Sequence, residues 1–136
     1  ETIAQELKIK ERIVLAGTVQ NPGPYYRGAD IFVMPSRYEG TPNALMEAMC
    51  YGLPVIITDA SSGPKELLGD SNSGLVTPVG DFGALALSLQ TLIDNSVLRA
   101  TIAKNARLIM DKRRRDDTSL STWDKVINFR EPLTRP

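Results

Sequence analysis

The chain has 136 residues, with sixteen basic and sixteen acidic side chains and a formal net charge of zero. This length is enough for one domain with a hydrophobic core, and the balanced charge gives no indication of a nucleic-acid partner. The sequence contains no histidine, which excludes histidine acid–base chemistry and most zinc sites, and its single cysteine cannot form an internal disulfide. No apolar run reaches the roughly 20 residues of a membrane-spanning helix, so a cytoplasmic protein is expected.

Strands and helices are predicted to alternate along the first part of the chain. Short apolar runs bounded by Gly, Pro and Asn indicate strands and turns, and the long apolar run after Pro42 indicates a buried helix. We expect a helix tail at Glu1–Lys8, a strand at Arg12–Ala16 and a turn at Asn21–Pro24, followed by one or two helical turns at Tyr25–Gly28. A strand is then expected at Ile31–Met34, a helix at Pro42–Tyr51 and a strand at Val55–Thr58. Tyr25, Tyr26 and Met34 are expected to serve packing alone.

The second part of the chain continues this alternation and then becomes helical. A short helix is expected at Pro64–Leu68 and a last strand at Leu75–Thr77. Three further helices follow, the first capped by Asp81 and ending near Asp94, the second capped by Ser96 and ending near Arg114, and the third at Ser119–Phe129. We therefore predict one domain over residues 1–129 and a disordered tail at 130–136.

The predicted strands are continuous runs of Val, Ile and Leu without polar alternation, and helices separate them. This pattern is typical of the α/β class, with a Rossmann-like parallel sheet covered by helices on both faces. Ligands bind beyond the carboxyl ends of the strands in such sheets. The loops expected at that edge are Gly17–Asn21, Pro35–Thr41, Asp59–Pro64 and Pro78–Gly80.

Glu47 is a carboxylate on a helix that is otherwise apolar. Burying an unpaired carboxylate is costly, so we expect Glu47 to have a dedicated partner. Thr41 is predicted as the N-cap and Pro42 as the first helical residue, and the amides at this helix start are suited to a phosphate. Glu47 lies about 8 Å further along the axis, where it could hold a ribose. The alternative is that Glu47 caps a neighbouring backbone amide.

Several segments stand in a fixed order around this pair of glutamates. They are a strand ending in Pro35-Ser36, the Glu39-x7-Glu47 pair, Gly52-Leu53-Pro54-Val55, Gly63-Pro64-Lys65-Glu66-Leu67-Leu68, Gly74-Leu75-Val76-Thr77-Pro78 and Asp81. Together they closely resemble the carboxyl-terminal, donor-binding part of the family-4 (group 1) retaining glycosyltransferases, which have the GT-B fold. The resemblance covers about residues 1 to 129.

The resemblance implies roles for individual residues. Glu39 matches the family's glutamate near the donor sugar and its leaving phosphate, so Glu39 is the candidate catalytic residue, and Glu47 matches the glutamate that binds the nucleotide ribose. The remaining candidate donor-binding residues follow the same motifs, with small residues or exposed amides near the sugar and phosphates, and they are Gly40, Thr41, Asn43, Ala44, Ser62 and Gly63. Thr41 and Pro42 depart from the commonest Phe-Gly pair of the family.

The implied chemistry is transfer of a sugar from a nucleotide diphosphate, most simply a UDP-linked one, to an acceptor hydroxyl with retained anomeric configuration. The Thr41-Pro42-Asn43 variant resembles a subgroup that builds bacterial polysaccharides and lipid-linked oligosaccharides, often from N-acetylhexosamine donors. Fixed dipoles and charges perform most of such catalysis. No cofactor and no metal are expected, since the sequence lacks an Asp-x-Asp triplet.

Parts of the family pattern are not found in these residues: a Lys and an Arg that grip the diphosphate, the first strands of the domain, and the acceptor-binding amino-terminal domain. We therefore predict that this chain alone does not catalyse transfer. The alternatives are a non-catalytic nucleotide-sugar binding module and a sugar-nucleotide epimerase of the same architecture. The basic run Lys112–Arg115 is read as a solvated helix end, with peripheral contact to anionic lipid at the inner face of the membrane as its alternative.

Overall fold

The computed structural model describes residues 2–69 and 72–116, and its centre is a three-stranded parallel sheet. The strand order is β1-β2-β3, with bounds Phe32–Met34, Val55–Thr58 and Leu75–Thr77. Phe32 pairs with Val55, and Ile56 pairs with Leu75. The predicted parallel sheet and its three strands are confirmed, with β1 beginning one residue later than expected.

Helices connect and cover these strands. In chain order they are α1 (Thr2–Glu6), the short 3-10 helix η1 (Lys10–Arg12), α2 (Gly23–Gly28), α3 (Asn43–Cys50), α4 (Ser62–Leu68), α5 (Phe82–Asp94) and α6 (Ser96–Asp116). Every helix predicted within the described residues is present, with ends shifted by one or two residues in most cases. The predicted helix at 119–129 and the predicted tail at 130–136 lie outside the described residues.

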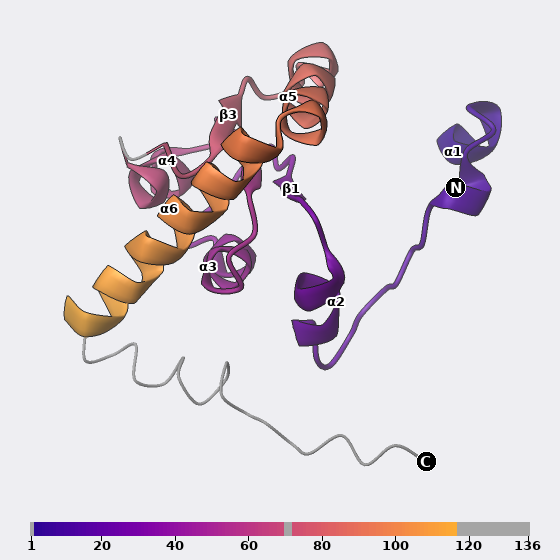
Figure 1. The fold of residues 1–136 in the computed structure, drawn as a ribbon. Coiled ribbons are helices and arrows are strands. Elements are labelled where there is room, and N and C mark those ends of the chain that lie inside the picture. Colours follow the sequence, from indigo (N-terminus) through magenta and orange to yellow (C-terminus); the bar gives the residue numbers. More distant parts are fainter. Residues whose placement is uncertain (1, 70–71, 117–136) are drawn as a thin grey trace.

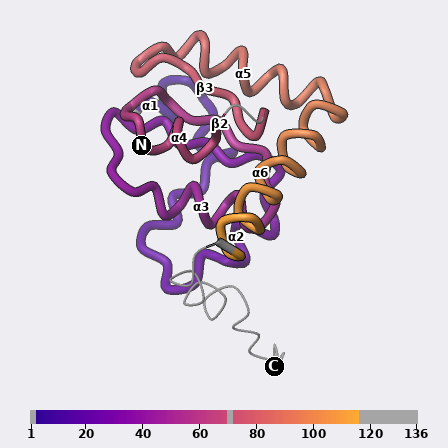
Figure 2. The backbone as a smooth tube through the Cα atoms, turned by 90° about the vertical axis from the view of Figure 1, so that its left-hand side faces the viewer, coloured from indigo at the N-terminus to yellow at the C-terminus, as the bar shows by residue number. Residues whose placement is uncertain are grey.

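Both faces of the central strand β2 are covered, because its successive side chains point to opposite sides. Val55 and Ile57 pack in one cluster with α3, the end of α4 and the second half of α6. Ile56 faces a second cluster, in which Leu92 of α5 and Ile102 of α6 are fully buried. Helix α6 runs across the molecule in Figure 1 and lies beside α3 in Figures 1 and 2. The expected α/β arrangement is therefore confirmed.

The strand predicted at 12–16 is wrong. Residues 13–17 are irregular, and Val14 and Leu15 are 85% and 70% exposed. Figure 1 shows this segment and α1 lying away from the sheet. Apolar residues form a strand only where a neighbouring backbone can receive their hydrogen bonds, and nothing in the described part of the chain pairs with this segment.

This difference also moves the loop at 17–21, which we expected at the carboxyl edge of the sheet. The Gly23 amide donates to Asn21 Oδ1 over 3.0 Å, and a β carbon on Gly23 would lie 2.8 Å from the Tyr51 hydroxyl. Figure 1 shows the chain between α1 and α2, which includes this loop, lying away from the sheet. The prediction for this loop is therefore wrong, since the strand that would have carried it to the edge does not form.

The first turns of the last two described helices, α5 and α6, are each capped by a side-chain oxygen. Asp81 Oδ1 accepts a hydrogen bond from the Ala84 amide over 2.8 Å, which confirms Asp81 as the cap of α5. At α6 the Leu98 amide donates to Asn95 Oδ1 over 2.8 Å, so Asn95 is the cap in place of Ser96. An Asn side chain binds the third amide of a helix as well as a Ser does, and here it comes one residue earlier. Among the described helices, none is both long and apolar enough to cross a bilayer.

Candidate functional site

Two loops meet beyond the carboxyl ends of β1 and β2, at residues 35–41 and 59–63. Thr58 Oγ1 donates to the Ser36 carbonyl over 2.5 Å, and Ser61 Oγ donates to the Glu39 carbonyl over 2.7 Å. The backbone of Gly63 also approaches the first loop, because a β carbon at this position would lie 2.8 Å from the Gly40 oxygen. The predicted residues Glu39, Gly40 and Gly63 are therefore brought together by the fold.

The carboxylate of Glu39 is held within its own loop. Ser36 Oγ donates to Glu39 Oε1 over 2.5 Å, and the glutamate is half-buried. A hydrogen bond between a hydroxyl and a carboxylate is among the stronger ones in proteins. Glu39 thus has a defined orientation at the edge of the sheet where parallel α/β folds bind ligands.

The start of α3 differs from the predicted cap. Pro42 is the N-cap, with φ −83° and ψ 75°, and the Asn43 amide donates to the Thr41 carbonyl over 3.0 Å. This is an inverse γ-turn centred on Pro42. The expectation that Thr41 caps the helix and that Pro42 is its first residue is therefore wrong, because the turn fixes both residues before the helix begins.

This turn changes which backbone amides are available. The Asn43 amide is already used by Thr41, and the Met46 amide donates to the Pro42 carbonyl over 3.1 Å. The amides of Ala44 and Leu45 donate to no acceptor among the described residues. They are the amides left at the positive end of the α3 dipole, where an anion is stabilised. Thr41, Asn43 and Ala44 are exposed, as is Ser62 at the first position of α4.

Glu47 lies on the second turn of α3 and is half-buried. We expected a partner for Glu47 without identifying it, and the polar side chain beside it is Tyr26 of α2. The ring of Tyr26 stacks on Tyr51 with centroids 5.3 Å apart, and its hydroxyl lies 3.5 Å from the Ala44 carbonyl. Burial, followed by a hydrogen bond and the charge of Glu47, raises the pKa of the Tyr26 phenol to about 12.

Tyr26 therefore does more than the packing role that we expected from the sequence. Its hydroxyl donates to the Ala44 carbonyl over 3.5 Å and lies near enough to Glu47 for that carboxylate to help raise the pKa of the phenol. No feature of the local sequence indicates this pairing, since Tyr26 and Glu47 lie on different helices.

Other polar residues of the site were not predicted as functional. Ser36 and Ser61 orient Glu39 and its loop, as described above, and Lys65 Nζ forms an ion pair with Asp59 Oδ2 over 2.9 Å. Both members of the ion pair are about half exposed, so it contributes at most about 1 kcal/mol to folding. Ser36 could have been predicted as a site residue, because it follows the end of a strand. The contact of Ser61 with the other loop could not, because it depends on tertiary structure.

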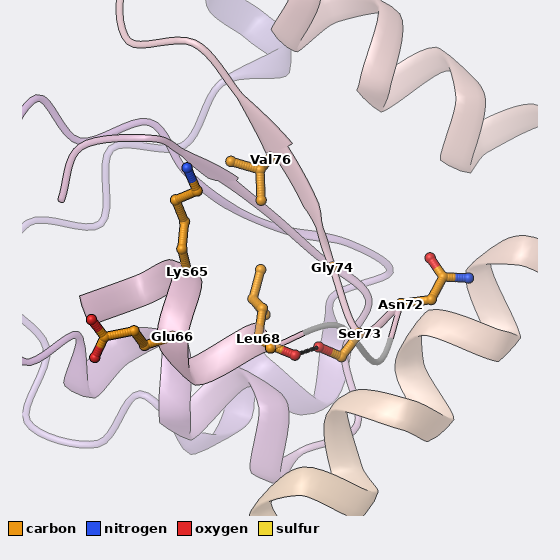
Figure 3. Close-up of a pocket in the computed structure, with 8 residues that line it drawn as sticks. Lys65, Glu66, Leu68, Asn72, Ser73, Gly74 and Val76 are labelled. Atoms are coloured by element: carbon orange, nitrogen blue, oxygen red, sulfur yellow. Dashed lines mark hydrogen bonds between the residues drawn. The ribbon is translucent and has the colours of Figure 1, made fainter. Parts of the chain in front are cut away.

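An open pocket of about 620 Å³ lies elsewhere, along α4 and the edge strand β3. Figure 3 shows Lys65 and Glu66 on α4, Val76 on β3, and the Ser73 hydroxyl donating to the Leu68 carbonyl over 2.8 Å. None of the predicted site residues lines this pocket. Across residues 2–69 and 72–116, the acidic and cysteine side chains form no group of three that could hold a metal ion.

Comparison with known proteins gives the chain a family. The sequence pattern of the family described as "Glycosyl transferases group 1" matches residues 1–109. The chain belongs to this family. The group 1 glycosyltransferase assignment made from the Glu39-x7-Glu47 region is thereby confirmed, and the solved structures below agree with the expected GT-B fold.

Individual relatives agree with this assignment. The chain is 30% identical over 131 residues to the N-acetylgalactosamine-N,N'-diacetylbacillosaminyl-diphospho-undecaprenol 4-alpha-N-acetylgalactosaminyltransferase of Campylobacter jejuni, covering 96% of this chain and 33% of that protein. It is 34% identical over 95 residues to the capsular polysaccharide biosynthesis glycosyltransferase CapM of Staphylococcus aureus, covering 70% of this chain and 25% of that protein. The chain thus spans about a third or less of the length of these curated relatives.

Solved structures show the same fold. The C-terminal domain of the group 1 glycosyltransferase LpcC from Francisella tularensis superposes with a TM-score of 0.73 at 27% identity, covering 82% of this chain and 58% of that one. The Anabaena protein HepE, solved in complex with UDP, superposes with a TM-score of 0.77 at 26% identity, covering 89% of this chain and 35% of that one.

Proposed function

We propose that this chain binds a nucleotide-diphosphate sugar, and that the protein carrying it transfers the sugar to an acceptor hydroxyl with retained anomeric configuration. The observation that carries the proposal is the arrangement at one edge of the sheet. The Glu39–Gly40 loop is fastened there to the loop before α4, and the start of α3 follows directly with Glu47 on its second turn. The layout suits a ligand with a sugar, a diphosphate and a ribose in a row.

In this proposal, Glu47 accepts hydrogen bonds from the ribose hydroxyls, and the available amides of Ala44 and Leu45 face the diphosphate. Thr41 and Asn43 are exposed at the same helix start, so their side chains can form polar contacts with the diphosphate in addition to those of the two amides. The α3 dipole adds stabilisation of negative charge at the same point.

The sugar would lie against the joined loops. Glu39 faces the anomeric centre and its departing phosphate, while Gly40, Ser62 and Gly63 allow the ligand to approach the backbone closely. Charge on the departing diphosphate and on the sugar ring is then stabilised by fixed dipoles and by a carboxylate that Ser36 already orients. This chemistry requires no metal and no cofactor.

The relatives support the choice of probes. One is named as an N-acetylgalactosaminyltransferase acting on an undecaprenol-linked saccharide, another is named as a UDP-Gal-dependent galactosyltransferase of Escherichia coli, and the Anabaena structure contains UDP. We therefore propose a UDP-linked hexose or N-acetylhexosamine as the donor, and a saccharide or lipid-linked saccharide as the acceptor. An acceptor of this kind would place the protein at the inner face of a membrane.

An amide-resolved NMR titration of the chain with UDP, GDP and ADP tests the proposal. We expect the amides from Thr41 to Glu47 to shift with one of the nucleotides, and Glu47→Ala to abolish these shifts. A well-dispersed spectrum that responds to none of the three nucleotides would count against the proposal. A protein that binds the nucleotide sugar but converts it without an acceptor would favour the epimerase alternative, and one that binds it without any turnover would favour a binding module.

A further inference from the structure

We propose that Ser61 is a positioning residue for Glu39, which fastens the Glu39 loop so that its carboxylate is held toward the sugar part of the donor. This inference rests on the proposed function. Ser61 itself is not required to touch the ligand, because it acts through the backbone of the loop opposite.

The first observation is that Ser61 does not perform the task that its position suggests. It is the N-cap of α4, where a Ser side chain normally accepts a hydrogen bond from an amide of the first turn. No such bond is formed, and the Ser61 hydroxyl instead donates to the Glu39 carbonyl over 2.7 Å. The side chain thus forms no hydrogen bond within its own helix and one with the neighbouring loop.

The second observation is that this bond is one of two hydrogen bonds that, with one close backbone approach, hold the Glu39 loop against the segment from Thr58 to Gly63. Thr58 holds the Ser36 carbonyl, Ser61 holds the Glu39 carbonyl, and Gly63 packs against the Gly40 carbonyl. The three contacts reach both ends of the loop. The Ser61 contact is at the backbone of Glu39, the residue whose carboxylate is proposed to face the sugar.

The third observation is the short bond from Ser36 Oγ to Glu39 Oε1. It requires Ser36 and Glu39 to keep their relative positions, and the contacts of Thr58 and Ser61 fix the backbones of these same two residues. Without the Ser61 contact, the Glu39 end of the loop can move while the Ser36 end stays fixed. A shift of this kind misplaces a carboxylate without unfolding the domain.

This argument predicts a selective effect on the sugar part of the ligand. The ribose and the diphosphate are assigned to Glu47 and the start of α3, which Ser61 does not contact through any described hydrogen bond. Ser61→Ala should therefore leave the affinity for UDP within about twofold of the original chain. The ratio of the dissociation constants of UDP-N-acetylgalactosamine and UDP should rise roughly three- to tenfold, as expected for the loss of one hydrogen bond.

Two further variants complete the experiment. Ser61→Thr keeps the hydroxyl and suits the extended backbone of this residue, with φ −169° and ψ 172°, so it should restore the original ratio. Ser96→Ala removes an exposed Ser hydroxyl from the start of α6, outside both loops, and should change neither affinity. Titration calorimetry with both ligands measures the ratio, and a dispersed amide spectrum confirms that each variant is folded.

A measurement without ligand separates this inference from the proposed function. The carbonyl carbon resonance of Glu39 reports the Ser61 hydrogen bond, and it should move upfield in Ser61→Ala but not in Ser61→Thr or Ser96→Ala. An unchanged resonance overturns the inference, and so does an equal loss of affinity for UDP and for the nucleotide sugar. If the unmodified chain binds neither ligand, the proposed function fails, and the role of Ser61 in donor binding fails with it, even where the resonance confirms the fastened loop.

Discussion

The two carboxylates of the candidate site are held in different ways. Glu47 lies within α3, whose backbone is fixed by regular hydrogen bonds and whose far end receives a hydrogen bond from Arg107 Nη1 at the Cys50 carbonyl. Glu39 lies on a loop that is held by contacts from Thr58, Ser61 and Gly63. A carboxylate on a helix depends mainly on its own element, whereas a carboxylate on a loop depends on the neighbouring segment.

This difference predicts which substitutions can disturb each carboxylate. Changes that affect Glu47 should come from the residue itself or from its partner Tyr26. Changes that affect Glu39 should also come from residues that never touch the ligand. The following predictions test this contrast in order of decreasing effect.

Glu47→Ala should give the largest loss of nucleotide affinity. It removes the charged acceptor of the proposed hydrogen bonds from the ribose hydroxyls, which corresponds to a roughly ten- to hundredfold weaker binding of UDP. Titration calorimetry measures this loss. Glu66→Ala, which removes an exposed carboxylate from α4, is the matched control and should retain the original affinity. Equal behaviour of the two variants would remove Glu47 from the site.

Gly63→Ala should separate the joined loops. The added β carbon would lie 2.8 Å from the Gly40 oxygen, so one of the two backbones must move, at a cost of about 1–3 kcal/mol in the free energy of unfolding. Chemical denaturation measures this cost. Gly28→Ala is the control, because a β carbon on this helical glycine meets nothing within 4 Å. If both variants are equally stable, the two loops are not in close contact.

Tyr26→Phe should have a smaller effect on Glu47. The variant keeps the ring that stacks on Tyr51 and removes only the hydroxyl that faces Glu47. We expect UDP to bind about two- to fivefold more weakly, since the carboxylate loses a polar neighbour and the first turn of α3 loses the hydrogen bond at the Ala44 carbonyl. Tyr25→Phe, at an exposed neighbouring position, should bind UDP as the original chain does. A loss shared by both variants would indicate that the hydroxyl of Tyr26 has no special role.

The same tyrosine predicts an effect that is confined to high pH. Its pKa is raised from 10.0 to about 12, so the folded state favours the neutral phenol. This stabilisation is present below pH 10 and is lost as the pH rises from 10 to 12. Between these values the free energy of unfolding should fall more steeply in the original chain than in Tyr26→Phe, which cannot titrate there. Parallel curves would contradict the raised pKa of Tyr26, which burial causes first and Glu47 second.

Most of the fold could be predicted from the sequence because the buried strands and amphipathic helices have clear local patterns. Strands β2 and β3 and the cap at Asp81 were predicted at their observed positions. The two failures have different physical causes. The segment 12–16 is apolar enough for a strand but has no described neighbour to pair with, and Pro42 forms a turn that its sequence does not distinguish from a first helical residue.

The site shows the same limit. Glu39 and Glu47 could be chosen because their spacing and their neighbours resemble a known motif, and the structure places Glu39, Gly40 and Gly63 together. The roles assigned to them from this resemblance remain predictions. The residues that hold them, Tyr26 and Ser61, come from elements distant in sequence. Contacts between elements distant in sequence cannot be predicted from local sequence patterns.

The position of α6 has a consequence for how the chain folds during synthesis. The last described helix supplies Ile102 to one face of the sheet and Ala106 and Met110 to the other, so neither cluster is complete until it has been made. At ~5–20 residues per second, the ~50 residues between the end of β2 and Met110 correspond to roughly 3–10 s of translation. During that interval β2, whose residues are all buried in the folded chain, lacks part of its cover, and its apolar side chains are open to a chaperone.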